Sequence, residues 1–139
     1  MDKRKIILLI WLAAILVPIN WIGRIAYYLR RGFWMALGFE PAHVIGHLIL
    51  FGGLVFLLVH LFQLPLNRRS AIVLSLLVLA LGVGQEIVQL QIKERGFGWP
   101  EIFDLVVDLT GGTLGWLAYR YFLRYRRYLQ MAYFMLREA

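Results

Sequence analysis

Four stretches of the chain are each about 20 residues long and predominantly apolar, covering about residues 6–24, 42–63, 70–91 and 101–122. A helix needs about 20 such residues to cross the hydrocarbon core of a bilayer. The 139-residue chain is 61% hydrophobic, whereas a soluble domain is nearer about 45–50% apolar. The sequence therefore predicts an all-α integral membrane protein with four transmembrane helices.

Turn-forming residues fall between these stretches. Pro41 and Pro100 lie where the second and fourth stretches begin, and proline suits the first turn of a helix. Pro65 follows the second stretch and helps to stop it, and Asn67 or Ser70 can cap the third. We therefore expect one four-helix transmembrane domain over residues 1–123, followed by a separate tail over residues 124–139.

Basic residues predict how the helices are oriented. With both termini in the cytoplasm, the inner side holds Lys3, Arg4, Lys5, Arg68, Arg69, Arg120, Arg124, Arg126, Arg127 and Arg137, and the outer side holds Arg24, Arg30, Arg31, Lys93 and Arg95. Cytoplasmic loops carry the excess of Lys and Arg in membrane proteins. The same rule explains the net charge of +7 without a nucleic-acid partner. We therefore expect an integral membrane protein with both termini in the cytoplasm.

Two segments outside the four stretches combine basic and aromatic residues. The outer loop at residues 27–40 is expected to form a short amphipathic segment on the membrane surface. The tail mixes arginine with aromatic residues, and we expect it to lie on anionic lipid headgroups. Docking of the tail to a partner protein is the alternative, with RNA binding a more distant one.

Ionisable and amide side chains lie inside three of the apolar stretches. They are His43 and His47 in the second, Glu86 and Gln89 in the third, and Asp104 and Asp108 in the fourth. In the predicted orientation all six lie in the outer third of the membrane. Such residues are expensive at membrane depth and usually face the interior of a bundle, where they mark a site. We expect the six to form an outward-facing polar pocket.

Small residues share the helical stripes that carry the acids. Gly82 lies on the stripe of Glu86 and Gln89, and Gly111 and Gly115 lie on that of Asp104 and Asp108. Small residues let membrane helices approach closely. We therefore expect Gly82, Gly111, Gly112 and Gly115 to lie at helix contacts.

Three interpretations of the six polar residues remain open. A hydrogen-bonded polar core is favoured, and a pocket for a ligand or lipid headgroup is the second. The third is a metal site built on His43 and His47 with the carboxylates of Glu86, Asp104 and Asp108. No nucleophile with an evident base accompanies them, which argues against a hydrolase. A membrane-embedded metal enzyme that uses these five residues stays open as an alternative. The chain has no cysteine, which excludes disulfides and thiolate metal ligands.

His60 lies near the inner end of the second stretch, on a different helical face from His47. A lone membrane histidine can ligate haem or chlorophyll, but it is more often an interfacial hydrogen-bonding residue. All three histidines belong to one expected helix, which disfavours bis-histidine haem ligation within the chain. No cofactor is expected.

The polar motifs resemble those of the VanZ-like family of small bacterial membrane proteins. His47 with Phe51 and Leu54 is similar to the family's first motif, and Glu86–Gln89 is similar to its Glu-x-x-Gln motif. Asp104, Asp108, Gly111 and Gly115 are similar to its last-helix motif, with Asp108 where asparagine is usual. The resemblance covers roughly residues 42–118, and it implies a multi-pass protein of a bacterial cytoplasmic (inner) membrane.

The resemblance implies a role in antibiotic resistance, because the family is named after a protein associated with low-level teicoplanin resistance. It suggests that the pocket engages a lipid, an envelope precursor or a lipophilic glycopeptide antibiotic. The alternative is a small accessory subunit packed against a larger respiratory or photosynthetic complex, since exposed aromatics and a basic tail also suit lateral contacts. Membrane lipids are expected partners in either case.

Overall fold

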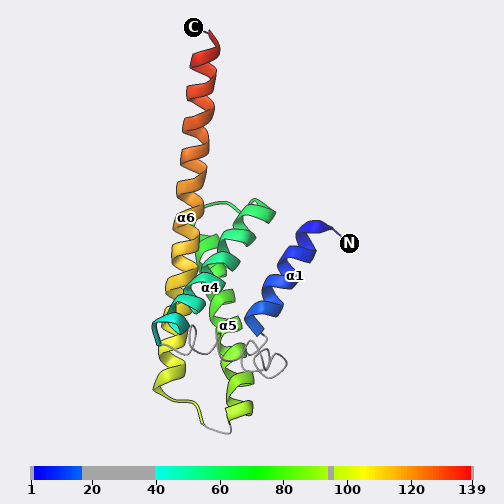
Figure 1. Cartoon of the computed structure of the whole chain (residues 1–139), viewed down its shortest axis with the longest axis vertical. Coiled ribbons are helices and arrows are strands. Elements are labelled where there is room, and N and C mark those ends of the chain that lie inside the picture. The colour runs from blue at the N-terminus through cyan, green and yellow to red at the C-terminus, as the bar shows by residue number, and fades with distance from the viewer. Residues whose placement is uncertain (1, 17–39, 94–95, 139) are drawn as a thin grey trace, which may run out of the picture.

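The structure is a computed structural model that describes residues 2–16, 40–93 and 96–138. Within those ranges the chain forms four helices and no strand: α1 (Lys3–Leu16), α4 (Glu40–Phe62), α5 (Arg68–Lys93) and α6 (Trp99–Glu138). The prediction of an all-α protein is therefore confirmed. Figure 1 shows α4, α5 and α6 side by side with α1 against them, and α6 projecting beyond the others.

Two of the described helices are long and apolar enough to cross a membrane. They are the segments His43–Phe62 of α4 and Arg68–Gln91 of α5, with mean hydropathies of 2.4 and 2.2. The first predicted span is described only as far as Leu16. The fourth lies in α6, where acidic residues, glycines and threonines dilute the apolar ones. Four spans thus remain a prediction, of which two have the required length and composition.

Local sequence explains where α4 begins and ends. Pro41 occupies its first turn, as expected. At its C-terminus Gln63 adopts a left-handed conformation with φ of 51°, and the backbone N–H of Leu64 donates to the carbonyl of Val59 at 3.2 Å. This is the Schellman pattern, which satisfies a carbonyl at the end of a helix. Pro65 follows at once and prevents the helix from resuming.

Side-chain caps set the starts of α5 and α6. The backbone N–H of Ser70 donates to the side-chain oxygen of Asn67 at 2.9 Å, so Asn67 is the cap of α5. The backbone N–H of Gly98 donates to Glu101 Oε2 at 2.8 Å. Here Glu101 reaches back from the third helical position, as in a capping box, and Pro100 lies in the same first turn.

The closest approach in the bundle joins α4 to α6 through glycines. A Cβ at Gly111 would lie 2.8 Å from the carbonyl oxygen of Leu48, and one at Gly115 would overlap the backbone of Gly52. Further from the polar residues, the core is apolar and is formed by Ile15, Phe51, Leu54, Val55, Val59, Leu74, Val78 and Tyr119. The backbones therefore meet where side chains are absent, and the remaining space is filled by branched and aromatic residues.

A tryptophan ties α1 to α4. The indole N–H of Trp11 donates to the carbonyl of Leu50 at 2.7 Å. Its ring lies over Gly53, where a Cβ would overlap it. A buried indole N–H usually finds such a partner, and this one fixes α1 against the middle of the bundle.

The predicted boundary between a transmembrane domain and a tail at residue 124 is not a break in structure. Helix α6 is continuous over 40 residues, which corresponds to about 60 Å at about 1.5 Å per residue. No proline or glycine occurs after Gly115, so nothing in the sequence stops the helix. The predicted amphipathic segment at residues 27–40 lies outside the described residues except for Glu40.

Candidate functional site

The six polar residues predicted from the sequence belong to one end of the bundle. His43 and His47 lie in the first turns of α4, Asp104 and Asp108 in the first turns of α6, and Glu86 and Gln89 in the last turns of α5. Figure 1 shows the start of α4, the start of α6 and the end of α5 together at its lower part. We call this the polar end of the bundle. The opposite end, with residues 3–5 and the turn at residues 63–67, is the basic end.

The deepest contact at the polar end joins α4 to α6. His47 Nδ1 lies 2.7 Å from Asp108 Oδ1, and the two residues are 4% and 1% exposed. An ionised Asp108 accepts a hydrogen bond from Nδ1–H, which leaves a lone pair on Nε2 of the neutral ring. The ring of His47 also stacks on Phe51, with centroids 6.3 Å apart. The imidazole is therefore fixed from two sides.

A second histidine–aspartate pair lies one helical turn nearer the polar end. His43 Nε2 and Asp104 Oδ2 are 3.2 Å apart, and their side chains are 47% and 13% exposed. The rings of His43 and His47 are in contact, with centroids 4.5 Å apart. The spacing of four residues on both α4 and α6 thus gives two parallel pairs, one buried and one at the mouth.

Helix α5 adds a buried carboxylate. Glu86 is 1% exposed and lies near enough to His47 for an electrostatic interaction between them. The approach of α5 depends on Gly82, where a Cβ would lie 2.6 Å from Asp108 Oδ2. Gln89 is half-buried one turn beyond Glu86. The polar cluster, as we use the term below, comprises His43, His47, Glu86, Asp104 and Asp108.

Two buried polar residues near this end were not among the predicted site residues. Glu101 is 1% exposed, and its bond to Gly98 gives it a role in starting α6. Gln85 is 8% exposed and immediately precedes Glu86, and its spacing of four from Gln89 places it on the same face of α5. A signal for Glu101 was present in the sequence, because a glutamate three residues after a candidate cap is the mark of a capping box.

All four glycines predicted to pack lie at close contacts. Gly111 and Gly115 face the α4 backbone, Gly82 faces Asp108, and a Cβ at Gly112 would lie 3.1 Å from Val78 Cγ2. The glycine partner on α4, Gly52, was not predicted. The acid-bearing stripe of α6 is therefore also its contact stripe with α4, as expected.

His60 lies elsewhere, among aromatic rings. Its ring contacts Phe56, Tyr119 and Phe122 at centroid distances of 6.2, 5.9 and 6.2 Å. Its Nδ1 is buried without a hydrogen-bond partner. These contacts place His60 in the packing of α4 against α6, away from the polar cluster.

An apolar cavity of about 80 Å³ lies between α4, α5 and α6, and its lining comprises Val55, Ala71, Leu74, Ser75, Val78, Leu109, Gly112, Thr113 and Trp116. Gly112 lies one helical turn along α6 from Asp108. None of the side chains of the polar cluster lines this cavity.

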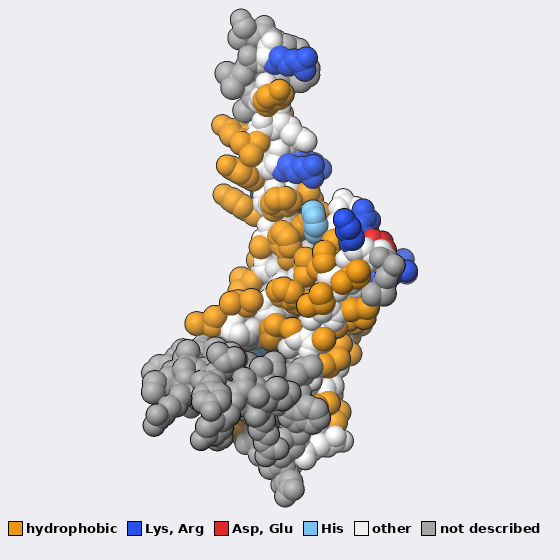
Figure 2. Space-filling model, turned by 45° about the vertical axis from the view of Figure 1, so that its right-hand side comes forward, with side chains coloured by type: hydrophobic (Ala, Val, Ile, Leu, Met, Phe, Trp, Pro, Cys, Tyr) orange, Lys and Arg blue, Asp and Glu red, His pale blue; other side chains and the backbone are white. Residues whose placement is uncertain are grey.

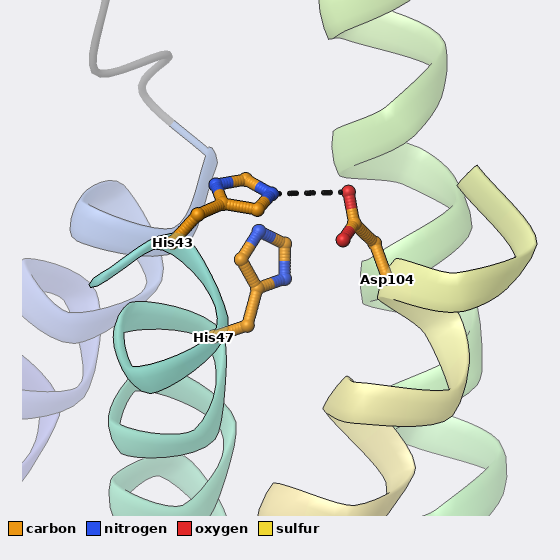
Figure 3. A group of neighbouring side chains, drawn as sticks. All are labelled: His43, His47 and Asp104. Carbon is orange, nitrogen blue, oxygen red and sulfur yellow. Dashed lines mark hydrogen bonds and ion pairs between the residues drawn. The ribbon is translucent and has the colours of Figure 1, made fainter. Parts of the chain in front are cut away.

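Three side chains at the polar end have the arrangement of metal ligands. One donor atom each from His43, His47 and Asp104 lies within 4.8 Å of the other two. Figure 3 shows the His43 ring directed at the Asp104 carboxylate, with the ring tip of His47 pointing between them. The cluster can therefore exchange hydrogen bonds with a ligand or coordinate a cation.

Comparison with protein-family models, curated proteins and solved structures finds no match for this chain. The resemblance to the VanZ-like family consequently remains an inference from the motifs alone.

Proposed function

We propose that the protein is a VanZ-like, multi-pass protein of a bacterial cytoplasmic membrane that binds the polar head of a lipid or lipid-linked molecule in its polar cluster. The observation that carries this proposal is the convergence of buried His47, Glu86 and Asp108 from three helices of a largely apolar bundle. Ionisable groups held inside apolar helices usually mark a site. In this proposal all four predicted helices cross the bilayer.

The outer surface of the bundle suits a lipid environment. Large apolar side chains are exposed on it, with Ile49 on α4 and Leu76 on α5 each 60% exposed. Figure 2 shows hydrophobic side chains over much of the described part of one face. Soluble monomers seldom expose contiguous apolar patches larger than a few hundred Å². Burial in acyl chains would remove this surface from water.

The charge distribution supports an outward-facing cluster. Lysines and arginines of α1, of the start of α5 and of the projecting part of α6 lie toward the basic end. The positive-inside rule assigns such an end to the cytoplasm. The polar cluster then opens toward the outer leaflet, where envelope precursors and externally added antibiotics are found.

The chemistry of the cluster restricts the ligand. Three carboxylates accept hydrogen bonds and repel anions, so a head that offers hydroxyl or amine donors is favoured over a bare phosphate. An attached hydrocarbon chain would lie against the apolar side chains exposed on the outside of the bundle, such as Ile49 and Leu76. A glycosylated or amine-bearing lipid, a lipid-linked envelope precursor and a lipoglycopeptide antibiotic share this combination.

A second candidate function rests on the projecting part of α6. Tyr121, Tyr125, Tyr128, Met131 and Tyr133 are each more than half exposed there. Exposed aromatic and methionine side chains are common at protein interfaces. This surface favours a small accessory subunit that docks laterally on a larger membrane complex.

One purification experiment distinguishes between the two candidate functions. The tagged protein is extracted from its native membrane in a polymer-bounded lipid disc, and the proteins, lipids and small molecules that accompany it are identified by mass spectrometry. A single species of amphiphile at about one per chain supports the pocket. Stoichiometric larger subunits with only bulk lipid would replace it with the accessory-subunit function.

A further inference from the structure

We propose that His43, His47 and Asp104 form a binding site for a divalent transition-metal ion, and Zn²⁺ is the ion with which to test it. The site goes beyond the proposed lipid-binding function and does not depend on it. Histidine nitrogen and carboxylate oxygen are established zinc ligands, and three protein ligands leave a fourth position open.

The spacing of the donor atoms fits a tetrahedral ion. Zinc lies about 2.0–2.2 Å from nitrogen and oxygen ligands, and tetrahedral geometry then places neighbouring ligand atoms about 3.3–3.5 Å apart. His43 Nε2 and Asp104 Oδ2 are 3.2 Å apart, which is already close to such an edge. The third donor, on His47, lies within 4.8 Å of both, so rotations of the His43 and Asp104 side chains would bring all three donors onto one ion.

The contact between Asp108 and His47, next to the three donors, is an independent observation that supports a metal site. Asp108 is 1% exposed and lies 2.7 Å from His47 Nδ1. A metal-binding histidine almost always gives its other ring N–H to a carboxylate or carbonyl, which fixes the tautomer and makes the free nitrogen more basic. The ring nitrogen of His47 that faces His43 and Asp104 in Figure 3 is the one left free. A hydrogen-bonded polar core does not require this arrangement.

The surroundings of the three donors also suit a cation. Asp108 and Glu86 are buried close to His47, and their charges offset that of a divalent ion. His43 is half-exposed, so an ion can reach the site from the polar end. The close glycine contacts between α4 and α6 hold the two histidines and Asp104 on adjacent backbones.

The test is direct titration of Zn²⁺ and Co²⁺ into protein purified with a tag that contains no histidine and stripped with chelator. The matched control is His60→Ala, which removes a histidine from the same helix α4 outside the site. The expected result is one ion per chain in the wild type and in His60→Ala, with a tetrahedral Co²⁺ absorption spectrum. His47→Ala and Asp104→Asn should bind at least about 100-fold more weakly.

The variant Asp108→Asn tests whether Asp108 positions His47 or binds the metal ion itself. Loss of an outer carboxylate partner typically weakens metal affinity about 10–100-fold, so this variant should keep the stoichiometry and the Co²⁺ spectrum at reduced affinity. Circular dichroism checks that each variant is folded. If one of these variants does not fold, His43→Ala is titrated in its place. Absence of stoichiometric binding in the wild type would overturn the proposal, as would equal loss in His60→Ala.

The metal-binding proposal and the lipid-binding proposal can be refuted independently of each other. Chelator-stripped protein that still retains its amphiphile but never binds Zn²⁺ overturns only the metal site. A protein that binds Zn²⁺ with the expected variant pattern but purifies without an amphiphile overturns only the lipid-binding function.

Discussion

The glycine contact between α4 and α6 gives the sharpest prediction for stability, through the variant Gly111→Ala. The added Cβ would lie 2.8 Å from the carbonyl oxygen of Leu48 and 2.9 Å from its Cα. Ordinary contacts begin at 3.4 Å, and neither atom belongs to a flexible side chain, so the helices must separate. Overpacking of this kind costs about 1–3 kcal/mol.

Gly84→Ala on α5 is the matched control, because a Cβ at Gly84 meets nothing within 4 Å. Alanine is favoured over glycine in a helix by up to about 1 kcal/mol, so this variant should be neutral or slightly stabilised. The free energies of unfolding of Gly111→Ala and Gly84→Ala should then differ by roughly 1–4 kcal/mol. The assay is SDS-induced unfolding in mixed micelles, followed by circular dichroism. Equal stability of the two variants would refute the close α4–α6 contact.

Three further predictions concern the polar end, the topology and a helix cap. Asp108→Ala leaves His47 Nδ1 buried without its partner and should lower the free energy of unfolding by about 1–3 kcal/mol in the same micelle assay; no loss would mean that the pair is not formed. Because the chain has no cysteine, single cysteines can be introduced and labelled in intact cells. A membrane-impermeant maleimide should label Gly96→Cys but not Arg69→Cys. The reverse pattern would mean that the protein has the opposite orientation in the membrane. Asn67→Ala removes the cap of α5 and should lower the free energy of unfolding by about 0.5–2 kcal/mol. An unchanged unfolding midpoint would show that Asn67 does not cap the helix.

Sequence periodicity predicted the helices and the polar side chains that gather at one end of the bundle. The spacing of four residues in His43–His47 and in Asp104–Asp108 places each pair on one face, and alternating helix directions bring the two faces to one end. The structure joins these residues as His43–Asp104 and His47–Asp108. The sequence could not assign these pairings, because either histidine could face either aspartate until the helix offset was known.

Other features were harder to predict from the sequence, because they depend on contacts between helices or on weak local signals. Gly52 was not predicted because its role follows only from the position of Gly115 opposite it. Helix α6 continues across residue 124 because no proline or glycine follows Gly115, and the boundary placed there from the change in composition stays a prediction. Glu101 was missed although its spacing from Gly98 fits a capping box, because glycine is a weaker cap signal than serine or aspartate.

Ligand retention by Asp104→Asn is the most direct test of the central claim that the polar cluster binds an amphiphile. Asp104 lies at the mouth of the cluster, 13% exposed, and the amide preserves its shape while removing its charge. The matched control, Asp2→Asn, removes a carboxylate near the basic end. Quantitative mass spectrometry of equal amounts of folded protein should show an amphiphile in the wild type and in Asp2→Asn, and at least about tenfold less in Asp104→Asn. Equal retention in all three proteins would contradict the account.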